Sequence, residues 1–338
     1  MRQIRLGIIG CGGFVRSHVK AINNHVPEFR IVALCDVSRK HLEKWRRTNL
    51  PRRKVALFTD HRKLLAKVKP EAVIVSTPHT LHFRHCYDAL AAGAHVLVEK
   101  PMVTNSADAR KLVALAEKKR LALQIAIQGT HTDTFAYARK LIGDGTIGEL
   151  QLITGVMAQG WLELTRGRWR QEPKLSGGGQ LYDSSAHVLS AIMFLVNSPV
   201  REVFCWTDYK GAKVDINAVG CIKFVNGCMA TITSGGNCPS FASDVTLQGA
   251  NALLKIRAHG GNFSVTGKQL QNEITAVPEG WDLPTVAPAR NFADVILGKA
   301  EPRCAGHLGV LLADLMDALY ASAASGKPVK VPPARAKK

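Results

Sequence analysis

The chain has 338 residues, 46% of them hydrophobic, and contains no apolar run near the roughly 20 residues that a membrane-spanning helix needs. This length exceeds the size at which one hydrophobic core stops growing, so we expect a soluble protein of two domains without a membrane partner. The formal charge of +19 suits either polyanion binding or simple solubility.

The basic residues show no nucleic-acid motif. They concentrate at Arg46, Arg47 and residues 52–54, and again in a Pro-rich basic tail at 331–338. Aromatic residues do not alternate with them, as they do in proteins that bind single strands. We therefore expect a solvated basic surface and regard a nucleic-acid partner as the weaker alternative.

The N-terminus and the cysteines indicate a cytoplasmic protein. Met1 leads almost directly into the apolar run Ile4 to Ile9 and a glycine loop, which leaves no room for a separate secretory segment. The eight cysteines are scattered without a Cys-x-x-Cys spacing, so we expect reduced, mostly buried thiols.

Residues 1–127 alternate short β-rich runs with amphipathic stretches, the pattern of βαβ units around a parallel sheet. Helices are predicted at about 13–25, 38–47, 61–68, 80–92 and 106–119, the last capped by Asn105 or Ser106. The six predicted strands, the number in a complete dinucleotide-binding fold, are Ile4–Ile9, Phe29–Asp36, Val55–Phe58, Ala72–Thr77, His95–Val98 and Leu121–Ile127.

Residues 128–330 show a different pattern. We predict a helix near 134–142, a strand at 149–160, a glycine-rich loop at 177–179 and one helix over 181–195. An antiparallel meander follows from Arg201 to Arg257, with a turn at Asn226-Gly227, and helices near 289–297 and 306–325 close the chain. The pattern indicates a second α+β domain with an open, mostly antiparallel sheet, and helix 306–325 is expected to pack back toward the first domain.

The segment from Gly7 to Val15 places glycines between the first strand and the first helix, as a pyrophosphate site requires. Val15 departs from the usual third Gly or Ala of the motif, and we expect slightly wider packing of helix and strand there. The residues expected at the cofactor in this loop are Gly10, Cys11, Gly12, Gly13 and Phe14.

Asp36 ends the second strand, where a carboxylate accepts hydrogen bonds from the adenosine ribose hydroxyls and repels a 2′-phosphate. NAD is therefore the expected cofactor. NADP stays possible because Arg39 and Lys40 follow closely and could pair with a phosphate. The alternative for Asp36 is a cap on the next helix.

Three longer segments resemble one known family. Ser76-Thr77-Pro78-His79-Thr80-Leu81-His82 is followed by the run 92–101, which ends in Glu99-Lys100-Pro101, and later comes the Gly-Gly-Gly-x-x-x-Asp-x-x-x-His pattern from Gly177 to His187. With these motifs the chain resembles the glucose–fructose oxidoreductase/inositol dehydrogenase (Gfo/Idh/MocA) family along nearly its whole length.

The resemblance implies a Rossmann domain at 1–127 that binds NAD(P), a substrate-binding and oligomerisation domain at 128–330, and a homo-oligomer, a dimer or a tetramer. It also implies chemistry on sugars or cyclitols, and roles for Glu99 and His82 on the cofactor side, with Thr77 and Pro78 near the nicotinamide. Thr130 stands in a region where many members carry an arginine, so we expect a substrate that does not need that guanidinium.

Alcohol oxidation needs a base at the hydroxyl proton while the hydride leaves for nicotinamide. We expect His187 to be that base, with Asp183 four residues earlier on the same helix face to orient it or to bind substrate. Lys100, at the carboxyl end of a parallel strand, would polarise the reacting oxygen. Whether His187 or Lys100 carries the proton stays open.

Other residues of these segments have weaker predicted roles. His79, His82 and His85 do not share one helix face, so we expect no metal site. Trp161 and Trp169 could stack on a sugar, although core packing suits them equally.

The sequence favours an NAD(P)-dependent oxidoreductase acting on a secondary alcohol of a sugar, cyclitol or sugar derivative. One alternative is an NAD-dependent enzyme that cleaves glycosides through a transient keto intermediate. The other, of a different class, is a non-catalytic protein that binds NAD or a polyanion.

Overall fold

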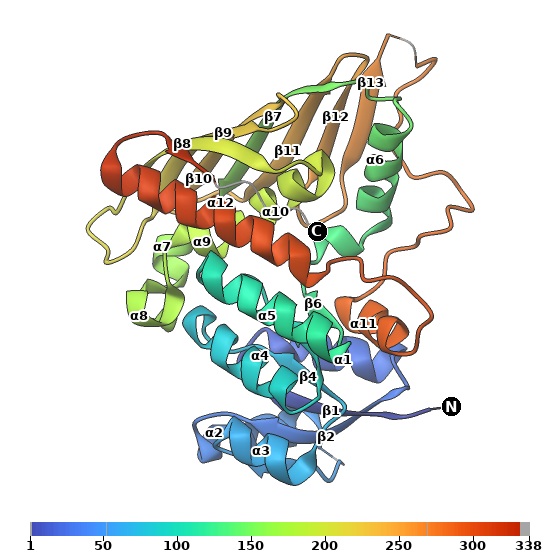
Figure 1. Cartoon of the computed structure of the whole chain (residues 1–338), viewed down its shortest axis with the longest axis vertical. Coiled ribbons are helices and arrows are strands. Elements are labelled where there is room, and N and C mark those ends of the chain that lie inside the picture. Colours follow the sequence, from blue (N-terminus) through green and yellow to red (C-terminus); the bar gives the residue numbers. More distant parts are fainter. Residues whose placement is uncertain (1, 52, 269, 332–338) are drawn as a thin grey trace. The chain divides into compact units, whose positions relative to one another are not determined.

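The computed structural model describes residues 2–51, 53–268 and 270–331, so Arg52 and all of the basic tail except Val331 lie outside it. Contacts divide the chain into two compact units. Unit 1 comprises Met1–Ala126 with Val286–Gly309, and unit 2 comprises Ile127–Thr285 with Val310–Lys338. Figure 1 shows the chain coloured by residue number, from blue at the N-terminus to red near the C-terminus, with the elements of both units labelled.

Unit 1 is built on a six-stranded parallel sheet with the order β3-β2-β1-β4-β5-β6, so the predicted Rossmann fold is confirmed. Two strands match their predicted limits, and the other four fall one or two residues inside them at one or both ends. They are β1 (Ile4–Ile9), β2 (Phe29–Cys35), β3 (Ala56–Phe58), β4 (Ala72–Val75), β5 (His95–Val98) and β6 (Leu123–Ile125).

Three helices of unit 1 begin where a short polar side chain accepts a backbone N–H group. Ser38, Asp60 and Asn105 cap α2, α3 and α5 in this way. The helical elements are α1 (Val15–His25), α2 (Arg39–Asn49), α3 (His61–Val68), η1 (His79–Leu81), α4 (His82–Ala91), α5 (Ser106–Lys119) and α11 (Pro288–Ile296).

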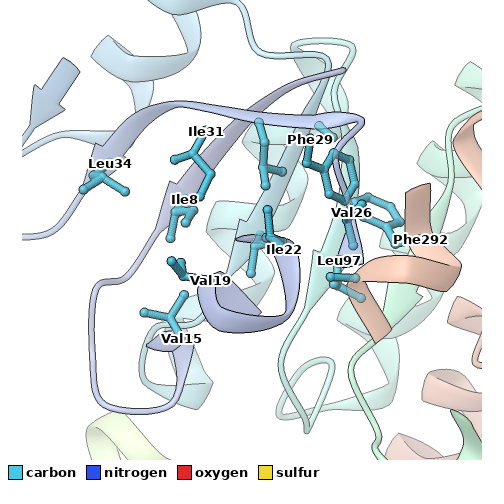
Figure 2. Close-up of a cluster of buried hydrophobic side chains, with 14 of the residues drawn as sticks. Ile8, Val15, Val19, Ile22, Val26, Phe29, Ile31, Leu34, Leu97 and Phe292 are labelled. Carbon is cyan, nitrogen blue, oxygen red and sulfur yellow. The ribbon is translucent and has the colours of Figure 1, made fainter. Parts of the chain in front are cut away.

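The core of unit 1 joins α1 to the sheet. Val15, Val19 and Ile22 of α1 face Ile8 and neighbouring strand residues (Figure 2). Val15, the departure from the glycine motif, is fully buried in this cluster. The valine methyl groups therefore contribute to the hydrophobic core.

Residues 286–309 return to unit 1, whereas the sequence assigns them to the second domain. Phe292 of α11 is fully buried and lies 5.9 Å from Phe29 between ring centroids. Arg290 pairs with the buried Glu28 at 2.6 Å. The apolar face of α11 is thus covered by the Rossmann core, and linear reading of the sequence does not reveal this return.

Unit 2 contains an eight-stranded sheet with the order β13-β12-β11-β7-β10-β9-β8-β14. The predicted open, mostly antiparallel sheet is confirmed, with one parallel pair between β7 and β10. The strands are β7 (Leu150–Ala158), β8 (Val200–Asp208), β9 (Asn217–Phe224), β10 (Met229–Gly235), β11 (Ala242–Gly249), β12 (Ala252–Arg257), β13 (Phe263–Gly267) and β14 (Val329–Lys330).

The continuous meander predicted from Arg201 to Arg257 is wrong in one respect. The hairpin at Asn226-Gly227 forms, with Gly227 at φ +92°, but β10 and β11 do not pair with each other. Strand β7 lies between them, parallel to β10 and antiparallel to β11. Central strands alternate buried and exposed residues regardless of their neighbours, so the sequence pattern does not identify the partner.

Unit 2 contains the predicted helices α6 (Asp133–Gly143), α10 (Ser185–Val196) and α12 (Gly306–Ser325), and the first turn of α12 belongs to unit 1. It also contains short helical elements that the sequence did not predict as separate helices. They are η2 (Gly129–His131), α7 (Trp161–Leu164), η3 (Trp169–Gln171), α8 (Pro173–Ser176) and α9 (Gln180–Asp183).

Helix α12 is long and apolar enough to cross a membrane by length and composition. Leu315 and Leu319 are nevertheless fully buried, and Ser322 accepts the N–H of Cys205 in β8 at 3.0 Å. Helix α12 therefore has the contacts of a core helix that packs on the eight-stranded sheet.

The prediction of a single helix over 181–195 is wrong, because the helix is interrupted at Ser184, between α9 and α10. The N–H of His187 bonds to the carbonyl of Ser184 at 3.1 Å, one residue closer than in an α-helix. Asp183 ends one helix and His187 stands in the first turn of the next.

Candidate active site

The glycine loop follows β1 at the carboxyl edge of the parallel sheet. Gly10 has φ +92°, and a Cβ there would overlap the backbone oxygen of Ser76. In contrast, nothing lies within 4 Å of the Cβ positions of Gly12 and Gly13. Phe14, which is 43% exposed, precedes the first turn of α1. The open backbone before a helix N-terminus fits the pyrophosphate of a dinucleotide.

Asp36 holds this loop directly. Its Oδ2 accepts the N–H of Cys11 at 2.9 Å, while the Cys11 side chain is buried in the core. Ser38, not Asp36, caps α2, which rejects the capping alternative. Arg39 donates to Glu43 and to the carbonyl of Leu57, at 3.0 and 2.9 Å.

Two side chains of α2 fix the carbonyls of the same loop, and the sequence did not predict them. His41 Nε2 donates to the oxygen of Cys11 at 2.7 Å, and Trp45 Nε1 donates to that of Gly12 at 3.3 Å. They lie four residues apart and so share one helix face. The loop carbonyls are held toward α2.

His82 joins the turns that follow β4 and β5. Its ring is fully buried, with Nε2 2.8 Å from the carbonyl of Thr77 and Nδ1 2.7 Å from that of Pro101. Burial lowers the pKa of His82, and the neutral ring donates to one of these carbonyls. His82 thereby lies between the turn of Thr77 and Pro78 and the turn of Lys100, with a hydrogen bond to one of them.

Glu99 is buried beside α1. Its Oε1 lies 2.6 Å from Nε2 of His18, and both side chains are less than one-tenth exposed. The imidazole satisfies the carboxylate that burial would otherwise destabilise. Glu99 thus connects the helix after the glycine loop to Lys100, which is half-buried at the end of β5. His18, like His41 and Trp45, was not predicted from the sequence.

His85 contacts Thr77 and makes stability depend on pH. Its Nδ1 lies 3.0 Å from the Thr77 hydroxyl, and burial together with His61 and His82 lowers the pKa of His85 to about 4, although Asp88 opposes the shift. In the unfolded chain His85 binds a proton near pH 6.5. The contribution of the neutral, buried His85 to the free energy of unfolding is therefore complete above that pH and is lost as the pH falls toward 4. Between pH 7 and pH 4.5 we expect the free energy of unfolding to fall by about 2 kcal/mol less in His85→Asn than in the wild type. Urea unfolding at the two pH values measures this difference, and an equal fall in both proteins would contradict the role of His85.

Asp183 accepts two hydrogen bonds at the end of α9. Trp161 Nε1 and Arg170 Nε each donate to its Oδ2 at 2.8 Å. Trp161 is 2% exposed, so it is a core residue, and Trp169 lies under the guanidinium of Arg170 at 4.5 Å. Arg170, which the sequence analysis did not assign a role, supplies a partly exposed positive charge beside Asp183.

The three glycines before α9 have structural reasons. Gly177 ends α8 at φ +77°, and a Cβ on Gly178 would overlap the hydroxyl of Tyr320. A Cβ on Gly179 would overlap the backbone oxygen of Asp215. These close contacts within unit 2 explain the triplet without an approaching substrate or cofactor.

Asp215 is a buried acceptor for the start of α9. Its carboxylate accepts the N–H of Gly179 at 2.7 Å, the N–H of Leu181 at 2.9 Å and the hydroxyl of Tyr320 at 2.6 Å. Burial and the charge of Asp215 raise the pKa of Tyr320, which keeps its proton on the hydroxyl. Asp215 and Tyr320 thus position the segment that carries Asp183.

His187 lies against a second imidazole. Its ring centroid is 4.1 Å from that of His259, which follows β12. The Nδ1 of His259 lies 2.6 Å from the hydroxyl of the buried Ser243. Asp183 and His187 belong to unit 2, whereas Lys100 and the predicted cofactor residues belong to unit 1.

Known proteins resemble this chain over both units. The family model described as "Oxidoreductase family, NAD-binding Rossmann fold" matches residues 4–127. The model of the GFO/IDH/MocA C-terminal domain matches residues 135–255. Together the two models match well over half of the chain.

Individual relatives are more distant. A dTDP-3,4-didehydro-2,6-dideoxy-alpha-D-glucose 3-reductase of Saccharopolyspora spinosa is 29% identical over 199 residues, which is 59% of this chain and 58% of that protein. An oxidoreductase domain protein from Kribbella flavida has a TM-score of 0.88 at 20% identity, covering 98% of this chain and 100% of that one. A levoglucosan dehydrogenase in complex with NADH and levoglucosan has a TM-score of 0.85 at 20% identity, covering 98% and 100%.

The solved structures support the fold, and the two family models support the assignment of both domains. The glycine loop, Asp36 and the turn of Lys100 lie in the part matched by the NAD-binding model. The chain belongs to the Gfo/Idh/MocA family of oxidoreductases, and its first domain is an NAD-binding Rossmann domain.

Proposed function

We propose that this protein is an NAD(P)-dependent dehydrogenase that transfers a hydride between a secondary alcohol of a sugar, cyclitol or sugar derivative and nicotinamide. The observation that carries the proposal is the gathering of polar groups at one edge of the parallel sheet. The glycine loop, Asp36, Thr77 and Lys100 follow β1, β2, β4 and β5. Ligands of such sheets bind at the carboxyl ends of the strands.

His187 is the proposed base for the hydroxyl proton, because imidazole exchanges protons near neutral pH. Asp183, whose Oδ2 accepts hydrogen bonds from Trp161 and Arg170, is proposed to bind a substrate hydroxyl. Lys100 is proposed to stabilise the developing alkoxide. When bound, the nicotinamide supplies the hydride acceptor.

The cofactor is proposed to lie on Gly10, Cys11, Gly12, Gly13 and Phe14, with Thr77, Pro78, Glu99 and Lys100 toward the nicotinamide. His82 is proposed to act on the cofactor side, where its ring lies between two of these turns. A sugar or sugar derivative is the proposed substrate because two similar proteins are a dTDP-sugar 3-reductase and a levoglucosan dehydrogenase.

Asp36 is expected to select NAD over NADP. Asp36→Ala removes both the acceptor for the ribose hydroxyls and the acceptor of the Cys11 N–H. We expect kcat/KM for NAD to fall about tenfold, which corresponds to about 1.4 kcal/mol, and the preference over NADP to shrink. Initial rates with both cofactors measure it, and an unchanged NAD/NADP ratio would contradict the assignment of Asp36.

A panel of sugars, cyclitols and sugar acids followed by NADH absorbance tests the function. Net NADH formation with one class supports a dehydrogenase. Release of an aglycone without net NADH would instead support glycoside cleavage. Binding of NAD with no turnover of any member would contradict both enzymatic functions.

We also propose a cytoplasmic homo-oligomer that assembles through the face of the eight-stranded sheet opposite α10. Leu152, Trp206, Val219 and Met229 are each 43–62% exposed, and part of this sheet borders a hollow of about 410 Å³. Exposed apolar groups on adjacent strands favour association. Light scattering is expected to give two or four times the mass of one chain, and a monomer at micromolar concentration would contradict this proposal.

A further inference from the structure

Two loops meet at one end of the sheet in unit 2. Strands β7 and β10 are parallel and end opposite each other at Ala158 and Gly235. The N–H of Gln159 bonds to the carbonyl of Gly235 at 3.0 Å, and that of Leu162 bonds to Gly236 at 2.7 Å. The chain after β10 is thereby fixed against the segment that carries Trp161, and it leads to Phe241 at the start of β11.

Phe241 begins a short series of rings that ends at the proposed base. Phe241 is 53% exposed, and its ring centroid lies 5.7 Å from that of His259. His259 in turn lies 4.1 Å from His187, with the ring planes 35° apart. A single exposed aromatic residue is ordinary on a protein surface, but Phe241 also contacts the proposed base through one intervening ring.

The middle ring of this series is held rigidly. His259 stands in the turn between β12 and β13, where Gly260 and Gly261 have φ values of +85° and +101°. The Ser243 hydroxyl lies 2.6 Å from His259 Nδ1, and the N–H of Ala258 bonds to the Ser243 carbonyl at 2.8 Å. A ring fixed at both backbone and side chain provides a preorganised surface.

We propose that Phe241 and His259 form the platform on which the six-membered ring of a pyranoside or cyclitol lies beside His187. The proposal rests on the dehydrogenase function above and specifies its substrate class as cyclic. The C–H face of such a ring is apolar and packs on an aromatic face, while hydroxyl groups at its rim suit imidazole nitrogens. An open-chain polyol has no flat C–H face to place there.

The other aromatic residues near Asp183 are less suited to this role. Trp161 is 2% exposed and donates its Nε1–H to Asp183. One face of Trp169 is covered by the guanidinium of Arg170. Phe241 is therefore the better aromatic surface for a sugar ring.

Steady-state kinetics of Phe241→Ala and Phe241→Tyr, on a cyclic substrate found in the panel, test the platform. We expect Phe241→Ala to raise KM at least about tenfold with kcat within about twofold, and Phe241→Tyr to restore most of the KM. Tyr209→Ala, which removes another exposed aromatic side chain of unit 2, is the matched control and should change neither constant. An unchanged KM in Phe241→Ala would overturn the platform.

A binding measurement separates this proposal from the function on which it rests. Saturation-transfer NMR with myo-inositol and methyl β-D-glucopyranoside, on the NAD-loaded protein, detects contact between protein aromatic protons and ligand C–H groups without turnover. We expect a signal in the wild type that Phe241→Ala abolishes and Tyr209→Ala retains. Absence of signal in the wild type, or an equal signal in Phe241→Ala, overturns the platform whatever the activity. A normal signal with no turnover of any member of the panel would overturn only the dehydrogenase.

Discussion

His187→Ala is expected to lower kcat by about 10²–10⁴-fold while the affinity for NAD stays unchanged. The imidazole is the proposed acceptor of the hydroxyl proton, and His187 is the one acid–base side chain among Ser185–Val196 of α10. Stopped-flow measurement of NADH formation, together with NAD binding by calorimetry, checks both parts. His25→Ala, at the exposed end of α1, is the control.

Lys100→Ala distinguishes which group carries the proton. If His187 is the base, Lys100→Ala loses rate but keeps the acid limb of the pH–rate profile, and His187→Ala loses that limb. If Lys100 is the base, the reverse holds. A loss below about threefold in both variants would show that neither group takes part in the chemistry.

Asp215→Ala is expected to lower the free energy of unfolding by about 3–5 kcal/mol, the largest stability effect that we predict. Asp215 is 1% exposed, and its removal leaves the N–H of Leu181 and the hydroxyl of Tyr320 without their acceptor. The N–H of Gly179 keeps only the long contact of 3.3 Å to the Tyr320 oxygen. Each buried unsatisfied donor costs about 1–3 kcal/mol, and partial relaxation keeps the sum below the maximum. Urea unfolding at pH 7 measures the change.

Tyr320→Phe is the matched control for Asp215. It removes one donor and leaves the carboxylate with its two backbone N–H partners, so we expect a loss of only about 1 kcal/mol. Asp215→Asn should fall between the two variants because its amide keeps one acceptor oxygen. Stability of Asp215→Ala within about 0.5 kcal/mol of the wild type would contradict the role of this carboxylate.

The sequence predicts the parts of the fold that local patterns determine. The Rossmann strands are short buried runs between amphipathic helices, and the Asn226-Gly227 turn is a strong hairpin signal. The return of residues 286–309 to unit 1 and the insertion of β7 between β10 and β11 depend on contacts distant in sequence. Periodicity does not encode such partners.

The same limit applies to the site. Lys100, Asp183 and His187 stand in motifs with recognisable spacing, so their candidacy follows from the sequence. Asp215 and His259 do not, because they reach the site from other strands or turns; Asp215 lies 36 residues from Gly179. The glycines at 178 and 179 are an example. They are required because the hydroxyl of Tyr320 and the backbone of Asp215 leave no room for a Cβ, and both neighbours are distant in sequence.

Isotope transfer from a labelled substrate tests the central claim most directly. A sugar or cyclitol from the panel, with deuterium on the carbon that bears the reacting hydroxyl, is incubated with the protein and NAD, and the nicotinamide product is analysed by mass spectrometry. One deuterium in the reduced cofactor for each ketone formed is the expected result. Ketone formation with no deuterium in the cofactor would contradict hydride transfer to nicotinamide as the function of this protein.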